Sequence, residues 1–362
     1  MSSSADLPAS IQWHTRLEDL PEDARHLLAM AGERNIELGY DWYANLTGTV
    51  YKDSGQLRFY VLRRDGAVQA VLPVRLDATR AGLKIAALAN FYTALYEPAF
   101  VAGLPVSDWT TLLKALKKDF PRAWCLWFSP MDPDSAAYHA LLAACRESGW
   151  VSFPFFCFGN WYLRVEEAWP GYFQKRAGAV RSTVKRMSKK FAAAGGRLQV
   201  ASKPSELPQA IAAYEQIYAR SWKKPEPHPD FIPGLIDTFG RTGQLLMGVA
   251  WIGEQPVASQ IWLVQGERAE IFKLAYDEDF KEYSPGTLLT TLLMESVFDQ
   301  VKEVDYLIGD DGYKAAWMSD RRERWGFVAY RPFSLQGSLA IAREAVARLL
   351  KRLRRKAPAE GI

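Results

Sequence analysis

The segment Ala269–Pro332, AEIFKLAYDEDFKEYSPGTLLTTLLMESVFDQVKEVDYLIGDDGYKAAWMSDRRERWGFVAYRP, decides the fold of this chain. Its apolar pattern predicts a strand over Ala269–Tyr276, a helix that begins after Ser284, a short strand over Val304–Ile308 and a final strand over Gly326–Arg331. A polar turn and a short helix separate the last two strands. Strands and helices that alternate in this way are typical of an α/β domain.

The turn that opens the helix is the first candidate for binding chemistry. Ser284 is a suitable N-cap, and Pro285 suits the first helical position because its missing N–H costs nothing there. Gly286 has no side chain to keep a ligand from the N–H groups of Gly286, Thr287 and Leu288. The unpaired donors and the positive dipole end of a helix start attract anions, so we expect the pyrophosphate of a nucleotide-like acyl donor here. The alternative is an ordinary helix start.

Three predicted strands precede this helix, and the first half of the chain repeats the same order. The strands are Gln244–Ile252, Pro256–Val264 and Ala269–Tyr276, joined by two short Gly-containing turns. In the first half we expect strands, a helix, a strand, a helix and two further strands at Gln56–Arg64, Ala67–Arg75, Gly82–Ala89, Ser107–Asp119, Ala123–Phe128, Asp134–Ser148, Val151–Phe158 and Trp161–Val165. The sequence therefore indicates a faint internal duplication, although the first half lacks a counterpart of Ser284–Gly286.

The chain resembles the CelD/BioF-like acetyltransferase group of the GNAT superfamily, which is related to the FemABX aminoacyltransferases. The resemblance rests on Gly159–Tyr162, Tyr172–Lys190, Pro256–Gln260, Lys273–Tyr276, Ser284–Leu289, Asp305–Lys314 and Arg321–Trp325, with Tyr40–Tyr43 and Asn90–Pro98 in the first half. It implies an α/β (α+β) tandem GNAT-like double domain, with mixed central sheets flanked by helices. The expected parts are a degenerate GNAT-like domain (1–165), a basic helical connector (166–205), a GNAT domain with the donor site (206–335) and a basic amphipathic helix and tail (336–362).

The resemblance also implies residues for the acyl donor and for the chemistry. It places a pantetheine arm along Lys273, Leu274 and Ala275, and it includes a lysine at Lys314 that is associated with phosphate binding in the FemABX relatives. Donor contacts are thus expected at Lys273, Leu274, Ala275, Ser284, Gly286, Thr287, Leu288 and Lys314.

Polar residues after the short strand are the candidates for proton transfer. Asp310 and Asp311 can supply a carboxylate base, since two close acids in a partly buried site raise a carboxyl pKa. Tyr313 can donate a proton to the leaving thiolate. The alternative is that Asp310 and Asp311 only form a turn and cap the next helix. Arg321–Arg324 is expected to be a mutual ion-pair surface.

Acceptor contacts are expected from aromatic residues in both halves. Tyr92, Tyr96 and Glu97 suit a sugar or amino sugar through stacking and hydrogen bonding, with core packing as the alternative. Trp222 belongs to a proline-rich loop, Trp222–Pro229, that we expect at the border of the acceptor cleft.

Two basic segments indicate anionic partners. No Asp or Glu occurs over 168–205, which contains nine Lys or Arg residues. Its apolar residues fall on one helical face, so we expect the cations on the other. This segment is either a solvated face or a rim for the phosphates of coenzyme A, a tRNA or a lipid-linked sugar. Ser338–Lys356 combines an apolar stripe with a cluster of cations, which predicts either dipole compensation or peripheral contact with an anionic membrane.

Composition narrows the class of protein. With 362 residues, 49% hydrophobic and 24% charged, the chain can form two domains, and it contains no apolar run long enough for a membrane span. The first residues lack the features of an export signal, and three cysteines in apolar contexts suit a reducing, cytoplasmic location. Four histidines without ligand spacing predict no metal.

The predicted function is acyl transfer from acetyl-CoA or another acyl-CoA. The acceptor would be an amine or hydroxyl of a sugar, a polysaccharide precursor or a similar small molecule or glycan, which attacks the thioester directly. One alternative is a FemABX-like transferase that uses aminoacyl-tRNA. An acyl carrier protein or a tRNA is a possible carrier of the donor group. An alternative of another class is a non-catalytic double-GNAT module that binds a glycan or a partner protein.

Overall fold

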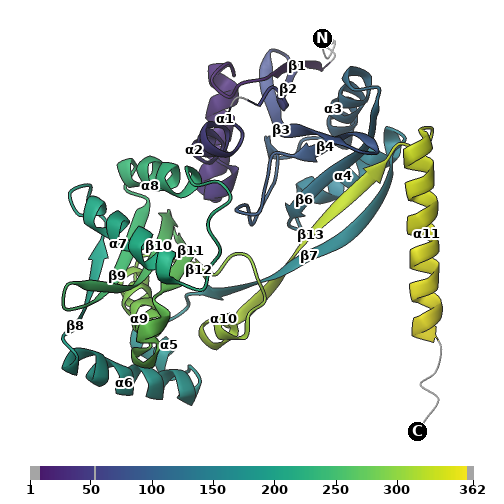
Figure 1. Ribbon diagram of the computed structural model, residues 1–362. Coiled ribbons are helices and arrows are strands. Elements are labelled where there is room, and N and C mark those ends of the chain that lie inside the picture. Colours follow the sequence, from purple (N-terminus) through teal and green to yellow (C-terminus); the bar gives the residue numbers. More distant parts are fainter. Residues whose placement is uncertain (1–8, 53, 357–362) are drawn as a thin grey trace. The chain divides into compact units, whose positions relative to one another are not determined.

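The computed structural model describes residues 9–52 and 54–356, which form two compact units that interleave along the chain (Figure 1). Unit 1 lies within Met1–Ala31, Asp53–Cys157 and Glu323–Ile362, and unit 2 is Gly32–Lys52 and Phe158–Arg322. The sequence analysis predicts domains that follow one another along the chain. The two units are instead each built from separated segments, because two long strands, β7 (Val151–Arg164) and β13 (Asp320–Tyr330), each contribute residues to both units.

Unit 1 contains a mixed sheet with the strand order β1-β2-β3-β4-β6-β13-β7, and the short β5 pairs with β3. Helices α3 and α4 contribute to its apolar core, which contains Tyr60, Trp109 and Phe327. Besides β7 and β13, the elements of this unit are β1 (Ser10–His14), α1 (Glu22–Arg34, whose last residues enter unit 2), β2 (Leu57–Arg64), β3 (Ala67–Thr79), β4 (Gly82–Ala87), β5 (Ala99–Phe100), α3 (Val106–Asp119), β6 (Ala123–Met131), α4 (Ala136–Glu147) and α11 (Leu335–Lys356).

Unit 2 contains a second mixed sheet with the strand order β7-β12-β11-β10-β9-β8. The pairs β8/β9, β9/β10 and β10/β11 are antiparallel, whereas β11 and β12 are parallel. Its further elements are η1 (Ile36–Leu38), α2 (Tyr40–Asn45), η2 (Leu46–Val50), α5 (Trp169–Gln174), α6 (Gly178–Ala193), β8 (Gly196–Ala201), α7 (Leu207–Arg220), α8 (Phe231–Arg241), β9 (Leu245–Ile252), β10 (Gln255–Gln265), β11 (Arg268–Tyr276), η3 (Glu278–Tyr283), α9 (Pro285–Val297), β12 (Glu303–Asp305) and α10 (Gly312–Trp317).

Helices cover both faces of the unit 2 sheet. Helix α9 packs against β9, β10 and β11, and α6 packs against α9 and β8. Met187 and Phe191 of α6 join the same apolar cluster as Trp262 of β10 and Leu289 of α9. Because successive residues of a strand point to opposite faces, the neighbours of Trp262 along β10 face helix α7 instead, and α8 packs against β9. The predicted basic connector is therefore largely part of this unit, through α5, α6 and β8.

The predicted order of elements is confirmed in both halves, with two corrections. The meander β2-β3-β4 followed by α3, β6, α4 and β7 corresponds to β9-β10-β11 followed by α9, β12, α10 and β13. The predicted strands Val151–Phe158 and Trp161–Val165 form one continuous strand, β7, because Gly159 and Asn160 keep an extended backbone. The predicted strand Val304–Ile308 is shorter, since β12 ends at Asp305.

The final strands of the two repeats are exchanged. In unit 1, β13 from the second repeat pairs with β6 of the first, with Phe327 opposite Phe128. In unit 2, β7 from the first repeat pairs with β12 of the second, with Leu163 opposite Val304. Each unit is therefore completed by a strand from the other half of the sequence.

None of the helices in the described part of the chain combines the length and the hydropathy that a membrane span requires. In the same residues, no three His, Cys, Asp or Glu side chains converge as metal ligands would.

Candidate functional site

The start of α9 offers fewer free amides than the sequence predicts. Ser284 adopts a left-handed conformation, with φ 49°, and its hydroxyl does not cap the helix. Its carbonyl instead accepts hydrogen bonds from the N–H groups of Thr287 (3.0 Å) and Leu288 (3.2 Å). The prediction that both of these N–H groups are free is therefore wrong. Pro285 has no N–H, and the Gly286 N–H donates to no acceptor among the described residues.

A buried glutamine fixes this first turn against the sheet. Gln260 of β10 donates from Nε2 to the Thr290 hydroxyl (2.7 Å) and to the Gly286 carbonyl (3.1 Å). Its Oε1 accepts the indole N–H of Trp262 at 2.8 Å. Since Gln260 is 1% exposed, these bonds form without competition from water. They hold the Gly286 peptide at a defined position beside β10.

The strand that leads to this turn has one open edge. Strand β11 pairs with β10 through Lys273, Leu274 and Ala275. On its other side, β11 pairs with β12 only over Arg268–Glu270, and within the described residues no strand pairs with that side beyond Glu270. An unpaired strand edge can hydrogen bond to an extended, amide-bearing ligand. The backbone of 273–275 is therefore open on this side, and its contact with a pantetheine arm stays a prediction.

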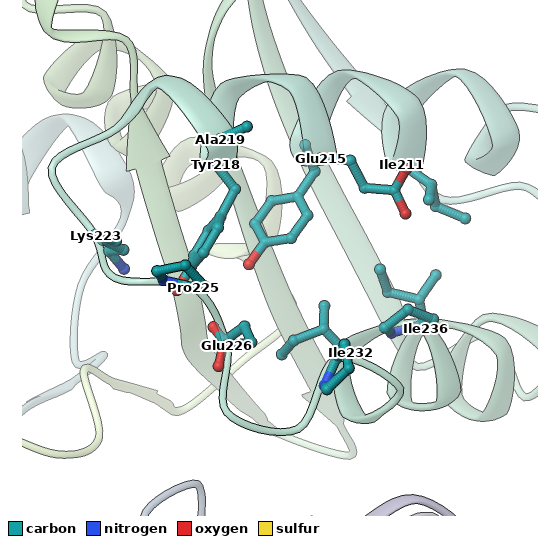
Figure 2. Close-up of a pocket in the computed structure, with 12 residues that line it drawn as sticks. Ile211, Glu215, Tyr218, Ala219, Lys223, Pro225, Glu226, Ile232 and Ile236 are labelled. Carbon is teal, nitrogen blue, oxygen red and sulfur yellow. The ribbon is translucent and has the colours of Figure 1, made fainter.

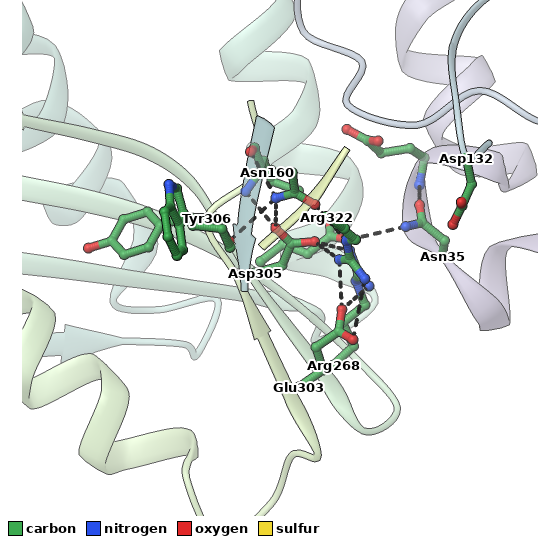
Figure 3. A network of polar contacts seen from close by, with 12 residues as sticks. Asn35, Asp132, Asn160, Arg268, Glu303, Asp305, Tyr306 and Arg322 are labelled. Atoms are coloured by element: carbon green, nitrogen blue, oxygen red, sulfur yellow. Dashed lines mark hydrogen bonds and ion pairs between the residues drawn. The ribbon is translucent and has the colours of Figure 1, made fainter. Parts of the chain in front are cut away.

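A buried ionic network fixes the chain where β12 ends (Figure 3). Asp305 is fully buried and accepts hydrogen bonds from the guanidinium groups of Arg268 and Arg322. Asn160 of β7 donates from Nδ2 to Asp305 Oδ1 (2.5 Å) and to the Leu307 carbonyl (2.9 Å), while its Oδ1 accepts from Arg322 Nε (2.6 Å). Leu307 has a positive φ of 53°, which this network holds in place.

Lys314 supports the next turn from inside. It is 5% exposed, and its ammonium group donates to the carbonyls of Tyr306 (3.2 Å) and Ile308 and lies 3.7 Å from an Asp311 carboxylate oxygen. Burial lowers the pKa of Lys314, and the charge of Asp311 opposes this shift. These contacts give Lys314 a role in positioning the loop, and its contact with a donor phosphate stays a prediction.

The two aspartates of the loop differ from the expectation and from each other. The Asp310 carboxylate is bound bidentately by Arg321, with Nε at 3.0 Å and Nη2 at 2.7 Å. This hydrogen bonding lowers the pKa of Asp310, opposite to the predicted direction, so Asp310 is a weak proton acceptor. The Asp311 side chain is largely exposed. Burial raises the pKa of Tyr313 to about 12, which keeps its hydroxyl protonated and able to donate at neutral pH.

Two arginines of the segment Arg321–Arg324 have partners outside it. Arg322 bonds to Glu303 and Asp305, and Arg324 lies 3.2 Å from Asp132. Sequence spacing could not reveal these partners because they come from distant strands and loops.

A pocket of about 440 Å³ opens between α7, α8 and the loop that joins them (Figure 2). Its lining is mostly aliphatic, proline and tyrosine, interrupted by charged residues; the residues are Ile211, Tyr214, Glu215, Tyr218, Ala219, Lys223, Pro225, Glu226, Pro229, Ile232, Pro233 and Ile236. Glu226 accepts a hydrogen bond from Lys273 Nζ at 2.7 Å. The pocket wall is therefore tied directly to β11, the strand with the open edge.

The pocket contains a lysine that the sequence analysis did not select. Burial, reinforced by the positive charges of Lys273 and Lys314, lowers the pKa of Lys223 to about 8. A lysine with such a pKa is partly neutral near physiological pH and can accept a proton. The only signal for Lys223 in the sequence was its position in the Trp222–Pro229 loop. Its burial depends on the packing of α7 and α8, which the neighbouring sequence does not reveal.

The predicted acceptor residues lie in two different places. Trp222 is 48% exposed, lies beside the pocket-lining Lys223 in sequence, and packs on Tyr276 at the end of β11 with ring centroids 4.6 Å apart. Tyr92, Tyr96 and Glu97 belong to unit 1 and are buried there. The Tyr96 hydroxyl donates to the Pro73 carbonyl at 2.8 Å, and its ring stacks on Phe128. These contacts show packing, and the substrate role of the three residues stays a prediction.

Comparison with known proteins identifies the domain that carries this site. Residues 178–315 match the family model of the acetyltransferase (GNAT) domain. The chain contains a GNAT domain. This domain starts at α6 and ends within α10, so it includes the open edge of β11, the α9 turn and the pocket. This match supports an acyltransferase activity for the chain.

Solved structures resemble the fold of most of the chain, including the parts outside residues 178–315. The crystal structure of FemX superposes with a TM-score of 0.60 at 9% identity, covering 89% of this chain and 97% of that one. A protein of unknown function from Bacteroides thetaiotaomicron gives 0.59 at 10% identity, covering 89% and 100%. A tandem GNAT protein from the clavulanic acid biosynthesis pathway gives 0.51 at 14% identity, covering 90% and 100%. No curated protein sequence matches the chain significantly.

Proposed function

We propose that the chain transfers an acyl group, foremost acetyl, from acyl-CoA to an amine or hydroxyl of a small acceptor such as a sugar or polysaccharide precursor, in the cytoplasm. The observation that carries this proposal is the open edge of β11 that leads to the Gly286 N–H at the start of α9. The donor pyrophosphate would bind the α9 start, and the amides of the pantetheine arm would pair with Lys273–Ala275. A backbone N–H on the same edge would polarise the thioester carbonyl.

The pocket beside β11 is the proposed acceptor site. Lys273 links the two, because its backbone lies on the donor strand while its ammonium group bonds to Glu226 of the pocket wall. The aliphatic and tyrosine walls suit the apolar faces of an acceptor, and Glu215 and Glu226 attract a cationic amine. Bringing acceptor and thioester together on one strand supplies the orientation that direct attack requires.

Proton transfer is assigned to residues around the same strand. The attacking amine or hydroxyl must lose a proton, and Lys223 is the strongest acceptor for it because its pKa is about 8. Asp311 is the second candidate base, since Asp310 is occupied by Arg321. Tyr313 would return a proton to the departing thiolate.

A second candidate donor is aminoacyl-tRNA, and the exposed cations of α6 favour it. Helix α6 buries Met187 and Phe191, which leaves Lys185, Lys189 and Lys190 exposed to solvent. Lys190 bonds to Glu282 at 2.6 Å and lies 4.8 Å from the Tyr283 ring, next to the α9 turn. This basic face can bind either the phosphates of CoA or a longer polyanion.

Calorimetric titration and a thiol-release assay test the proposal. The titrants are CoA, acetyl-CoA and charged tRNA, and thiol release is measured with amine and amino-sugar acceptors. We expect CoA to bind and Lys223→Gln to slow thiol release without changing CoA affinity. Binding of charged tRNA with no CoA affinity would replace the proposed donor. A wild-type rate for Lys223→Gln would remove Lys223 as the base.

A further inference from the structure

Helix α11 is attached to unit 1 by one narrow side. Ala340 and Ile341 pack against the cluster of Cys125, Val328 and Tyr330. Two turns further along, Arg348 donates to the Pro154 carbonyl at 2.9 Å, and its guanidinium lies 5.0 Å from the Phe153 ring. In Figure 1 this yellow helix stands beside the ends of β7 and β13 of the same unit. The attachment is small for a helix of 22 residues.

The opposite side of α11 is apolar and exposed. The exposed residues are Leu335 (74%), Leu339 (63%), Val346 (55%), Leu349 (57%) and Leu350 (50%). At 100° per residue these five positions fall within an arc of about 100°, centred roughly opposite Ala340, Ile341 and Glu344. An amphipathic helix of a globular protein normally turns its apolar stripe to the core, so an outward stripe indicates a partner surface.

The charge of the helix determines which partner fits. The sequence of Leu335–Lys356 contains seven Lys or Arg residues and one Glu, a net charge of +6, and five of these cations lie in the last six positions. A second copy of this chain would bring an equal positive charge against the first, which opposes a helix-to-helix dimer. Anionic lipid headgroups neutralise the cations, and the acyl boundary accepts leucine and valine side chains.

We propose that α11 binds the surface of an anionic phospholipid bilayer, lying in the interface with its outward apolar stripe inserted. The stripe supplies apolar burial, and the cations of the helix bind lipid phosphates. Ala340 and Ile341 lie outside the apolar stripe, so they can stay packed on unit 1 while the stripe is inserted. This mode of binding is independent of which acyl donor or acceptor the GNAT domain uses.

Flotation of the full chain with lipid vesicles tests this proposal. We expect binding to vesicles of phosphatidylcholine mixed with phosphatidylglycerol and at least tenfold weaker binding to phosphatidylcholine alone. The double variant Leu339→Gln, Val346→Gln should lose at least tenfold in partitioning, because two inserted side chains become polar. The matched control Ala345→Gln, Ala347→Gln alters exposed positions beside the stripe and should bind as wild type.

A charge variant separates the electrostatic part. Arg343→Gln should weaken binding to the anionic vesicles roughly fivefold and leave binding to phosphatidylcholine unchanged. Since the altered side chains are exposed, thermal melting should show every variant folded. Equal partitioning of wild type and the stripe variant would overturn the proposal. So would sedimentation velocity showing a wild-type dimer that the stripe variant dissociates, because the partner would then be a second copy.

Discussion

Replacing Gly286 by Asp should separate the stability of the protein from its affinity for the donor. Gly286 is the second residue of α9, and the first turn of that helix contains no acidic residue. A Cβ at this position would first meet Tyr276 Cδ1 at 3.8 Å, which is ordinary contact, so the new side chain has room. A carboxylate in the first turn interacts favourably with the helix dipole by about 0.3–1 kcal/mol, so the free energy of unfolding should rise slightly.

The same carboxylate should repel an anionic donor. Two unit charges 4 Å apart repel by about 1 kcal/mol in bulk water and about 4 kcal/mol at the effective dielectric of a protein surface. We therefore expect the Kd for CoA to rise between roughly fivefold and almost a thousandfold. Gly286→Ala adds the Cβ without the charge, so its Kd should stay within about threefold of wild type.

Isothermal titration calorimetry with CoA and with dephospho-CoA measures both effects of the charge. Dephospho-CoA keeps the pyrophosphate, so the loss of affinity in Gly286→Asp should persist with it. A parallel denaturant titration gives the free energy of unfolding. If Gly286→Asp folds as stably as wild type and binds CoA equally well, the donor phosphates do not lie at the start of α9, and the proposed donor site is wrong.

Four further substitutions test the surroundings of this site. Lys223 has a folded-state pKa of about 8 against 10.5 when unfolded, so between these pH values the unfolded chain binds more protons and stability should rise with pH; Lys223→Gln should remove this rise in denaturant titrations at pH 7 to 10.5. Lys273→Met should raise the pKa of Lys223, measured by NMR of reductively methylated lysines, and an unchanged pKa would mean that their charges do not interact. Asp305→Ala leaves two buried guanidinium groups without their shared carboxylate and should cost about 3–5 kcal/mol of unfolding free energy, whereas loss of the more exposed Glu303 carboxylate in Glu303→Gln should cost clearly less. Gln260→Leu leaves the Trp262 N–H buried without an acceptor and should cost about 1–3 kcal/mol; a melting curve identical to wild type would contradict the role given to Gln260.

Local sequence patterns predicted most of the fold because they specify local structure. Hydrophobic periodicity located both meanders and the helix after Ser284, and the repeated order of elements indicated the duplication. The pattern failed at Gly159–Asn160, which looks like a turn in sequence. Asn160 stays extended because its side chain bonds to Asp305 and Leu307, which lie almost 150 residues away in sequence. No local signal reports a bond of that kind.

The site was predictable only where its chemistry is local. The helix start at Ser284–Gly286 was correctly located, but the number of free amides depends on the left-handed backbone of Ser284. The pKa of Asp310 depends on Arg321, which follows on β13 after an intervening helix. Lys223 became a candidate only once burial and two further lysines were visible around it. Electrostatic properties are set by three-dimensional neighbours, and these are what a single sequence does not contain.

The crossed ends of β7 and β13 have a consequence for how this protein can change. A gene fragment that encodes only residues 206–335 would leave Val304 without Leu163 beside it, and the complementary fragment would leave Phe128 without Phe327. Either half expressed alone would therefore expose the edge of a β-strand that is paired in the full chain. A first repeat without catalysis of its own would still supply β7, the strand that pairs with β12 of the second repeat.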